Sequence, residues 1–475
     1  MVLIKNLNNI KLFILNILLI FLFSVLARLY FYANFSDKIL TTGDVFEYST
    51  GVEMISKGYG LVEYDQVFDK LVNYSRRPPF FFYSSYFIKK IFKTNSITAI
   101  IILNFAAHTL IILLSTYLTY IINLDTNLSI INGWLMTLNI NLFYNSLLIM
   151  SDTYFTLLII SFTIIALKSI NNPKFYFLSG VILALATLTR PTSKFLWIFF
   201  IIYLLFFYKE KKQFIKNSLI FLIGYILLII PYHIYVYKKY NLKSLDSFQG
   251  TYATWKMNKL FNTTDYTSLI NKDASYSVIL NILKKHEHPI GPVEIEVRKK
   301  LNLTVEEFSE KLTKLAIYTI LHNPIGYSKL FLENIINNIS SASSYLSIID
   351  LFKPGYYDKQ HKIMIDIIEN KKFKSKSIKY ILLNIIFRII NILFFILSLI
   401  GMYISLNKIN KKITTFLLLI LSYIIIFSSL SSSYDRYRLP VEFIISFYLT
   451  YFIYNFKELS QKFSKSIKIP FKIFG

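Results

Sequence analysis

Carboxylates and arginines gather in the segment that directly follows the first long apolar run. Asp44 and Glu47 lie close together at its start, and Arg76–Arg77 precede Pro78–Pro79 at its end. A carboxylate at a membrane surface can remove a proton, and a guanidinium can grip a phosphate through two parallel hydrogen bonds. This combination indicates a site where a proton is removed near a phosphate.

Asp44 opens a helical pattern, because Val45, Tyr48, Val52 and Ile55 recur on one helical face. One interpretation of Asp44 is structural, since an Asp at a helix start caps free N–H groups. The functional interpretation is a general base, because a partly exposed carboxylate at the positive end of a helix stays ionised near neutral pH.

Other charged residues have equally plain structural interpretations. Asp152 fits a solvated turn at the end of an apolar run, and Arg190 fits a side chain that reaches up to the membrane interface. Arg28 is more demanding, because a charge inside an apolar run needs a partner or a cavity. His286 and His288 lie two apart without a third ligand cluster, so a solvated loop is favoured over a zinc site.

Composition places the chain in a membrane. Of its 475 residues 54% are hydrophobic, and many windows exceed the roughly 18 apolar residues of a membrane span. The formal charge of +25 comes from lysines between the apolar runs, which favours cytoplasmic loops and anionic lipid over nucleic acid. The chain has no cysteine, no Gly-rich phosphate loop, no Gly-x-Ser-x-Gly elbow and no Rossmann fingerprint.

The apolar pattern predicts an all-α polytopic bundle of about ten transmembrane helices, the first one retained rather than cleaved as a signal peptide. Pro79–Phe92 is expected to lie in the interface, because only then do the basic loops 209–212 and 408–412 fall in the cytoplasm with both termini. The expected spans are 10–32, 97–122, 127–149, 152–170, 174–190, 194–208, 214–237, 379–405, 412–432 and 438–456.

Three regions follow from this topology. Residues 1–237 form a transmembrane module whose catalytic first outer loop is 33–96, and 379–475 hold the C-terminal transmembrane helices and a basic cytoplasmic tail. Residues 238–378 form a large extracytoplasmic loop or small, mostly helical domain. In this loop Thr304 and Glu307 fit a capping box before an amphipathic helix that stops at Asn323–Pro324, and a second amphipathic stretch follows.

Seven short motifs occur in an order that resembles the membrane glycosyltransferases of the GT-C superfamily, in particular the group with protein O-mannosyltransferases and the bacterial lipid A aminoarabinose transferase. The resemblance covers the first half of the chain and the tail near Arg436. The motifs are Gly43-Asp44-Val45-Phe46-Glu47-Tyr48, Ser56-Lys57-Gly58-Tyr59-Gly60, Arg77-Pro78-Pro79-Phe80, Ser151-Asp152, Thr189-Arg190-Pro191, Pro231-Tyr232-His233 and Arg436-Tyr437-Arg438-Leu439-Pro440.

This resemblance implies an enzyme of the inner or plasma membrane whose active site faces away from the cytoplasm. It would move a sugar from a polyprenyl phosphate to an envelope glycolipid, glycan or protein, with inversion of the anomeric centre. The chemistry needs one base and phosphate-binding cations, and it leaves assistance by a divalent metal open. The implied catalytic residues are Asp44 and Asp152, and the implied substrate-binding residues are Glu47, Tyr48, Arg77, Arg190, Arg436 and Arg438, with no metal ligand assigned.

Two alternatives remain at the level of sequence. A lipid-linked-sugar flippase or transporter would place charges along a path through the middle of the bilayer, whereas this chain has few charges at the centres of its spans. An O-antigen polymerase or ligase would carry its key residues in the loop 238–378. Separate substitution of Asp44 and of charged residues in that loop distinguishes the latter class.

Overall fold

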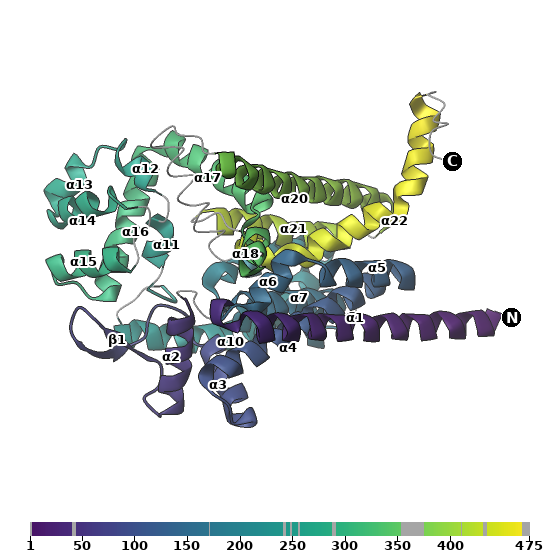
Figure 1. Ribbon diagram of the computed structural model, residues 1–475, viewed down its shortest axis with the longest axis horizontal. Helices are drawn as coiled ribbons and strands as arrows, with labels where there is room; N and C mark the ends of the chain where they lie inside the picture. The colour runs from purple at the N-terminus through teal and green to yellow at the C-terminus, as the bar shows by residue number, and fades with distance from the viewer. Residues whose placement is uncertain are drawn as a thin grey trace.

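The computed structural model describes the chain except for residues 1, 40–43, 171, 241–243, 248, 255–256, 287–290, 353–374, 410, 431–434 and 468–475. It is an all-α polytopic membrane protein, as predicted. In the described part, seven helices are long and apolar enough to cross a bilayer. They are α1 (Val2–Ile39), α4 (Ser96–Asn123), α7 (Asp152–Ser169), α10 (Lys211–Tyr240), α20 (Ser375–Lys408), α21 (Lys411–Ser429) and α22 (Glu442–Ile467) (Figure 1).

The other three expected spans form shorter helices. α8 (Lys174–Thr187) and α9 (Leu196–Phe207) are apolar but short, and η1 (Pro191–Ser193) lies between them. The segment 127–149 is broken into α5 (Thr126–Thr137) and α6 (Ile140–Leu147). The break occurs because Asn139 begins a new helix: its side chain accepts a hydrogen bond from the backbone N–H of Leu142.

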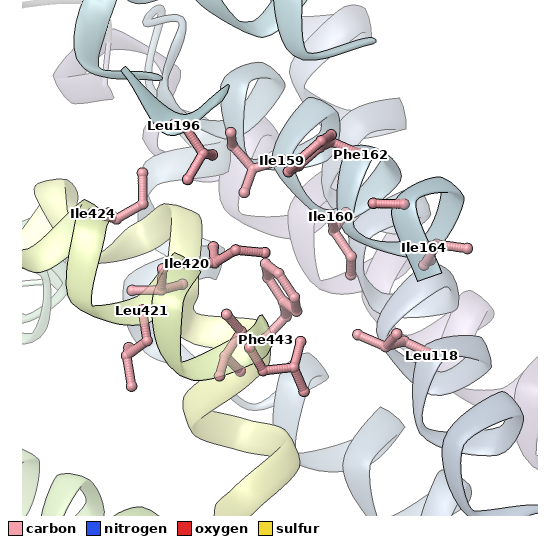
Figure 2. Close-up of a cluster of buried hydrophobic side chains, with 14 of the residues drawn as sticks. Leu118, Ile159, Ile160, Phe162, Ile164, Leu196, Ile420, Leu421, Ile424 and Phe443 are labelled. Atoms are coloured by element: carbon pink, nitrogen blue, oxygen red, sulfur yellow. The ribbon is translucent and has the colours of Figure 1, made fainter. Parts of the chain in front are cut away.

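The helical bundle packs around a continuous apolar core. Figure 2 shows part of it: Ile159 and Phe162 of α7, Leu421 of α21 and Phe443 of α22 belong to one buried cluster. Lipid is as apolar as these side chains, so close packing rather than water exclusion holds the helices together. Helices α8 and α10 touch through glycines: a Cβ on Gly180 would lie 2.1 Å from the carbonyl oxygen of Phe221.

Helix α1 is attached to the bundle through a buried polar contact. Only 17% of the most apolar stretch of α1 is buried inside the protein, yet the side chain of Arg28 is fully buried. Its guanidinium donates to the carbonyl oxygen of Phe105 at 2.6 Å and to hydroxyls of Ser24 and Thr109 at 2.9 and 2.5 Å. The expected partner of this charge is therefore a set of carbonyl and hydroxyl oxygens on α1 and α4, which offsets the cost of its burial.

The first loop outside the bundle carries α2 (Asp44–Ser56), a hairpin of β1 (Val62–Asp65) and β2 (Lys70–Asn73), and α3 (Phe80–Phe92). The strands are antiparallel, with Val62 opposite Asn73. The predicted apolar face of α2 is confirmed, since Val45, Tyr48, Val52 and Ile55 are all buried. Helix α3 has 13 residues, about 20 Å of helix, and is too short to cross a bilayer by itself.

The long loop forms a helical lobe with its own apolar core. The predicted capping box at Thr304 and Glu307 is present, and α16 ends just before Asn323. The lobe and the helices that follow it are α11 (Gln249–Thr254), α12 (Asn258–Phe261), α13 (Thr267–Lys272), α14 (Ser275–Leu283), α15 (Pro292–Leu301), α16 (Val305–His322), α17 (Pro324–Ser340) and α18 (Ser343–Phe352).

Two lysine-rich links lie together at one end of the bundle. The lobe, α2 and the hairpin lie at one end, and both chain termini lie toward the other (Figure 1). The lysine-rich links between α9 and α10 and between α20 and α21 meet each other, since the Lys412 ammonium donates to the carbonyl oxygen of Phe207 at 3.0 Å. Because α9 and α21 also pack side by side, these two basic links share one end of the bundle.

Candidate active site

Asp44 is the first described residue of α2 and lies between two arginines that come from distant parts of the chain. Its Oδ1 is 3.5 Å from Nη2 of Arg77, and its Oδ2 is 3.6 Å from Nη1 of Arg436. The carboxylate remains 30% exposed. It is therefore surrounded by positive charge without being held in a tight ion pair, and it stays accessible to a substrate.

Arg77 is held in one orientation by α2. Its Nε and Nη2 donate to the two carboxylate oxygens of Glu47 at 3.0 and 2.9 Å, and its Nη1 donates to the hydroxyl of Tyr48 at 2.9 Å. The guanidinium also lies over the Tyr48 ring, 4.9 Å from the centroid. A planar fork fixed in this way is already oriented before a substrate arrives, so it loses little further side-chain freedom if it binds an anion.

A second ion pair comes from the transmembrane helices. Asp152, at the start of α7, forms an ion pair with Arg190, which precedes η1. Asp152 is only 3% exposed, and its Oδ2 is buried without a hydrogen-bond partner among the described residues. The hydroxyl of Ser151 is 2.9 Å from that of Tyr48, so this second cluster is joined directly to the first.

The charges around Asp44 set its protonation state. Burial by itself raises the pKa of this carboxyl, but the nearby Arg77, Arg436 and Arg190 outweigh burial and bring the pKa below its ordinary value. Asp44 is consequently ionised at neutral pH, as a proton acceptor must be.

Most of the predicted site residues thus lie together, but Arg438 does not. Its guanidinium donates to Oε1 of Glu442 at 2.7 Å and to the carbonyl oxygen of Asn338 at 3.1 Å, on the far side of η2 (Asp435–Tyr437) and η3 (Leu439–Val441). Arg436 and Arg438 belong to successive short turns and point to different neighbours. The expected role of Arg438 in substrate binding lacks the geometric support that Arg436 has.

Several residues of this region escaped the sequence analysis. The Tyr74 hydroxyl donates to Glu47, and the ring of Tyr437 lies beneath both Arg190 and Arg436. Tyr74 is one of 36 tyrosines in the chain and carries no usable signal, and Tyr437 belongs to the late motif at Arg436 without an assigned role of its own. Only the fold brings these rings to the arginines.

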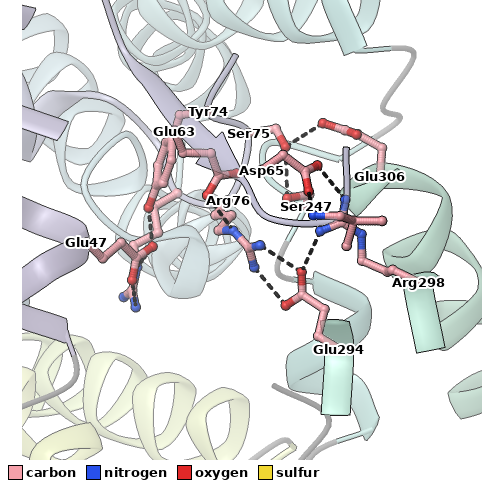
Figure 3. Close-up of polar contacts among 12 residues, drawn as sticks. Glu47, Glu63, Asp65, Tyr74, Ser75, Arg76, Ser247, Glu294, Arg298 and Glu306 are labelled. Atoms are coloured by element: carbon pink, nitrogen blue, oxygen red, sulfur yellow. Dashed lines mark hydrogen bonds and ion pairs between the residues drawn. The ribbon is translucent and has the colours of Figure 1, made fainter. Parts of the chain in front are cut away.

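Next to the cluster, a network of buried charges connects the hairpin to the lobe (Figure 3). Arg76 donates to Oε2 of Glu63 at 2.8 Å and forms a two-bond pair with Glu294 of α15 at 2.9 and 2.7 Å. Arg298, also on α15, reaches Oδ2 of Asp65 at 2.5 Å. The fork of Arg76 is thus occupied by the carboxylates of Glu63 and Glu294.

This network predicts a pH-dependent stability. Burial raises the pKa of Glu63 from 4.5 to about 7, although Arg76 acts in the opposite direction. The folded chain thus holds a proton that the unfolded chain releases between these two values, so stability falls as the pH rises through this window. Glu63→Gln should weaken this fall, as measured by thermal unfolding midpoints of the purified protein from pH 4.5 to 7.5.

Glu296→Gln is the matched control, since Glu296 is an exposed residue of α15, the helix that this network joins to the hairpin, and pairs with Lys300 on the surface. As the pH rises, the thermal unfolding midpoint of wild type should fall more than that of Glu63→Gln, so the difference between the two midpoints should change in favour of the variant. A gap that is constant over this range would contradict the assignment.

Two cavities meet at Arg76 and Arg77. The larger, about 610 Å³, contains Asp44 and Arg436 and extends along the hairpin to α15. The smaller, about 380 Å³, contains Arg190 and Lys194 and is walled mainly by apolar groups. The apolar residues of the smaller cavity include Phe195, Leu245, Ala253, Met257, Ile320, Phe427 and Leu430.

The donor set for a metal ion is limited in this part of the molecule. Within the ranges that the structure describes, no group of three or more His, Asp or Glu residues lies close enough to hold a metal ion. Glu287 and His288 of the His286–His288 motif lie outside the described residues.

Comparisons with known proteins agree with this architecture. Residues 76–235 match the family model of dolichyl-phosphate-mannose-protein mannosyltransferases. No curated protein matches the chain. The oligosaccharyltransferase AglB of Archaeoglobus fulgidus, solved with an inhibitory peptide and a dolichol-phosphate, is 12% identical with a TM-score of 0.51, and the alignment covers 96% of this chain and 52% of that one.

Two further structures of the Archaeoglobus fulgidus oligosaccharyltransferase give the same result. The apo form aligns with a TM-score of 0.52 at 12% identity, over 96% of this chain and 52% of that chain. The form tethered to an acceptor peptide aligns with a TM-score of 0.52 at 12% identity, over 95% and 50%. The chain thus spans about half the length of the solved proteins it matches, and at this identity the likeness shows the fold. The chain therefore shares its fold with these oligosaccharyltransferases, and its residues 76–235 match the mannosyltransferase family model.

Proposed function

We propose that this chain transfers one sugar from a polyprenyl-phosphate donor to a hydroxyl group of a glycolipid, glycan or protein acceptor on the extracytoplasmic face of the cell membrane. The observation that carries the proposal is the position of Asp44, an ionised and accessible carboxylate between Arg77 and Arg436. It lines the larger cavity, which adjoins the smaller one at Arg76 and Arg77. A base and a phosphate-binding fork are the two groups that this reaction needs.

The smaller cavity suits the donor. Its apolar walls match a prenyl chain, and the cations Arg77, Arg190 and Lys194 among its lining residues could neutralise a phosphate. The larger cavity suits the acceptor, because it is lined by Asp44 and by further carboxylates such as Glu47 and Glu63. With the two substrates on opposite sides of Arg77, the acceptor oxygen would approach the anomeric carbon from the side away from the phosphate.

In the proposed reaction Asp44 accepts the proton of the acceptor hydroxyl as its oxygen bonds to the anomeric carbon. The bond between that carbon and the phosphate oxygen breaks, and the electron pair leaves with the polyprenyl phosphate. Arg77 and Arg436 stabilise the charge that develops on the phosphate, so no strong general acid is needed. Attack from the opposite side inverts the anomeric centre. Phosphate bound by these arginines also shields their charge from Asp44, which makes the carboxylate a stronger base at the moment of reaction.

Orientation of the site follows from the lysines. The link that follows α20 lies at the end of the bundle away from α2 (Figure 1), and it contacts the link between α9 and α10 through Lys412 and Phe207. The positive-inside rule assigns that end to the cytoplasm. A topology reporter fused after Lys212 should therefore give a cytoplasmic signal, and one within 260–275 an extracytoplasmic signal. A cytoplasmic signal at 260–275 would reverse the molecule and remove Asp44 from the outer face.

The reaction itself is tested with purified protein in lipid, supplied with a polyprenyl-phosphate sugar. Release of polyprenyl phosphate that depends on an added acceptor fraction supports the proposal. The acceptor fraction comes from the envelope of a strain lacking the gene, where mass spectrometry should show glycolipids or glycoproteins one sugar lighter than in the parent. An unchanged envelope and no release of polyprenyl phosphate would refute it.

A further inference from the structure

One exposed face of α16 changes its chemistry along the helix. Glu307, Glu310, Lys314, Ile317 and Leu321 follow one another at alternating spacings of three and four, so they lie on the same side. The first three are charged, whereas Ile317 and Leu321 are apolar and 52% and 70% exposed. A helix whose exposed face passes from charge to hydrocarbon within two turns is typical of a segment that crosses a water–lipid boundary.

The apolar surface continues on α17. Ile325, Leu332 and Ile336 are 72%, 57% and 59% exposed. The opposite side of α17 is packed against transmembrane helices: Leu330 and Asn334 are buried, and the Asn334 amide donates to the carbonyl oxygen of Ser429 at 3.0 Å. Figure 1 shows α17 beside α20, between the lobe and the membrane helices.

The depth of α17 is fixed by its partners. Ser429 is the last residue of the apolar helix α21, and Arg388, which donates to the side-chain oxygen of Asn337 at 3.2 Å, lies within the apolar segment Ile381–Leu406 of α20. Residues on α20 at this level, such as Ile385 and Ile389, are themselves apolar and exposed. The exposed side chains of α17 therefore continue the lipid-facing belt of the bundle.

We propose that the end of the lobe is inserted in the membrane: the surface formed by Ile317, Leu321, Ile325, Leu332 and Ile336 contacts lipid acyl chains. The water–hydrocarbon boundary then lies between Lys314 and Ile317, and Lys329 on α17 reaches back to the headgroups. The lobe predicted as a wholly extracytoplasmic domain is thus partly a membrane element. This surface adjoins Ile320 and Tyr327, which line the smaller cavity, so lipid chains reach the wall of that cavity from the side.

The chain contains no cysteine, so a single introduced cysteine provides the sole labelling site. Leu321→Cys, Leu332→Cys and Ile336→Cys carry a nitroxide label in the full-length protein in lipid nanodiscs. Glu310→Cys is the aqueous control on the same face of α16, and Leu22→Cys, exposed on α1, is the lipid control. Collision of the label with oxygen, which concentrates in lipid, is compared with collision with a water-soluble nickel chelate.

Labels at 321, 332 and 336 should lose chelate collisions and gain oxygen collisions relative to 310, and should match the label at 22. Chelate access at 321 and 332 equal to that at 310 would overturn the proposal, because the surface would then lie in water. Shielding from both reagents, or spin–spin broadening between labels, would also overturn it, because protein or a second copy of the chain would cover the surface. These results do not depend on catalysis, so they stand or fall separately from the proposed reaction.

Discussion

Asp44→Asn is expected to lower turnover by roughly two to four orders of magnitude, the usual contribution of a positioned base, while the protein remains folded and inserted. Asn fits the start of a helix as well as Asp does. The substitution weakens only loose ion pairs, since the nearest arginine nitrogens lie 3.5 and 3.6 Å from the carboxylate. A fall in turnover is therefore attributable to proton removal. The measurement is the initial rate of sugar transfer, with the amount of folded protein checked by size-exclusion chromatography.

Asp152→Asn is the matched control for this variant. Asp152 is buried in an ion pair with Arg190, whereas Asp44 is accessible, so we expect Asp152 to orient the site rather than accept the proton. Its substitution should cost less turnover and more stability, because it leaves a buried arginine without its carboxylate. Near-native turnover of Asp44→Asn together with a dead Asp152→Asn would show that the base lies in the other loop. Activity in both would count against glycosyl transfer altogether.

Arg77→Ala should impair use of the donor more than Arg77→Lys does. Lysine keeps the positive charge but not the planar fork, so it can attract a phosphate without gripping it through two bonds. Both variants lose the two-bond geometry of the ion pair with Glu47, which Arg77 now makes at 2.9 and 3.0 Å. The difference between them isolates the charge. The relevant measurement is the dependence of the initial rate on donor concentration at saturating acceptor.

Glu47→Gln tests whether the fixed orientation of the Arg77 guanidinium contributes to donor binding in addition to its charge. It removes the carboxylate that orients the guanidinium but leaves the guanidinium in place. Donor use should then lie between that of wild type and that of Arg77→Ala, because an unanchored fork loses more side-chain freedom when it binds phosphate. Unimpaired donor kinetics in both Arg77 variants would reduce Arg77 to an anchor for lipid headgroups.

Local periodicity explains which structural predictions from the sequence succeeded. The burial of Val45, Tyr48, Val52 and Ile55 and the capping box at Thr304 depend on residues within a turn or two of each other. A helix fixes such relationships by its own geometry. Length and hydrophobicity likewise identify the membrane helices, because a bilayer core demands about 20 apolar residues in succession. The break at Asn139 was missed, since an apolar run of sufficient length hides a helix start inside it.

The sequence by itself determined that the chain crosses a membrane repeatedly and that Asp44 begins a helix just after the first span. Only the tertiary structure decided which cations reach Asp44. Arg77 and Arg436 do, Arg438 does not, and Arg76 turns instead to Glu294 in the lobe. The physical reason is that an arginine side chain is long and its direction depends on the packing of segments far apart in the chain. Arginines at neighbouring positions therefore have different partners, and a local sequence pattern cannot predict which partner each one has.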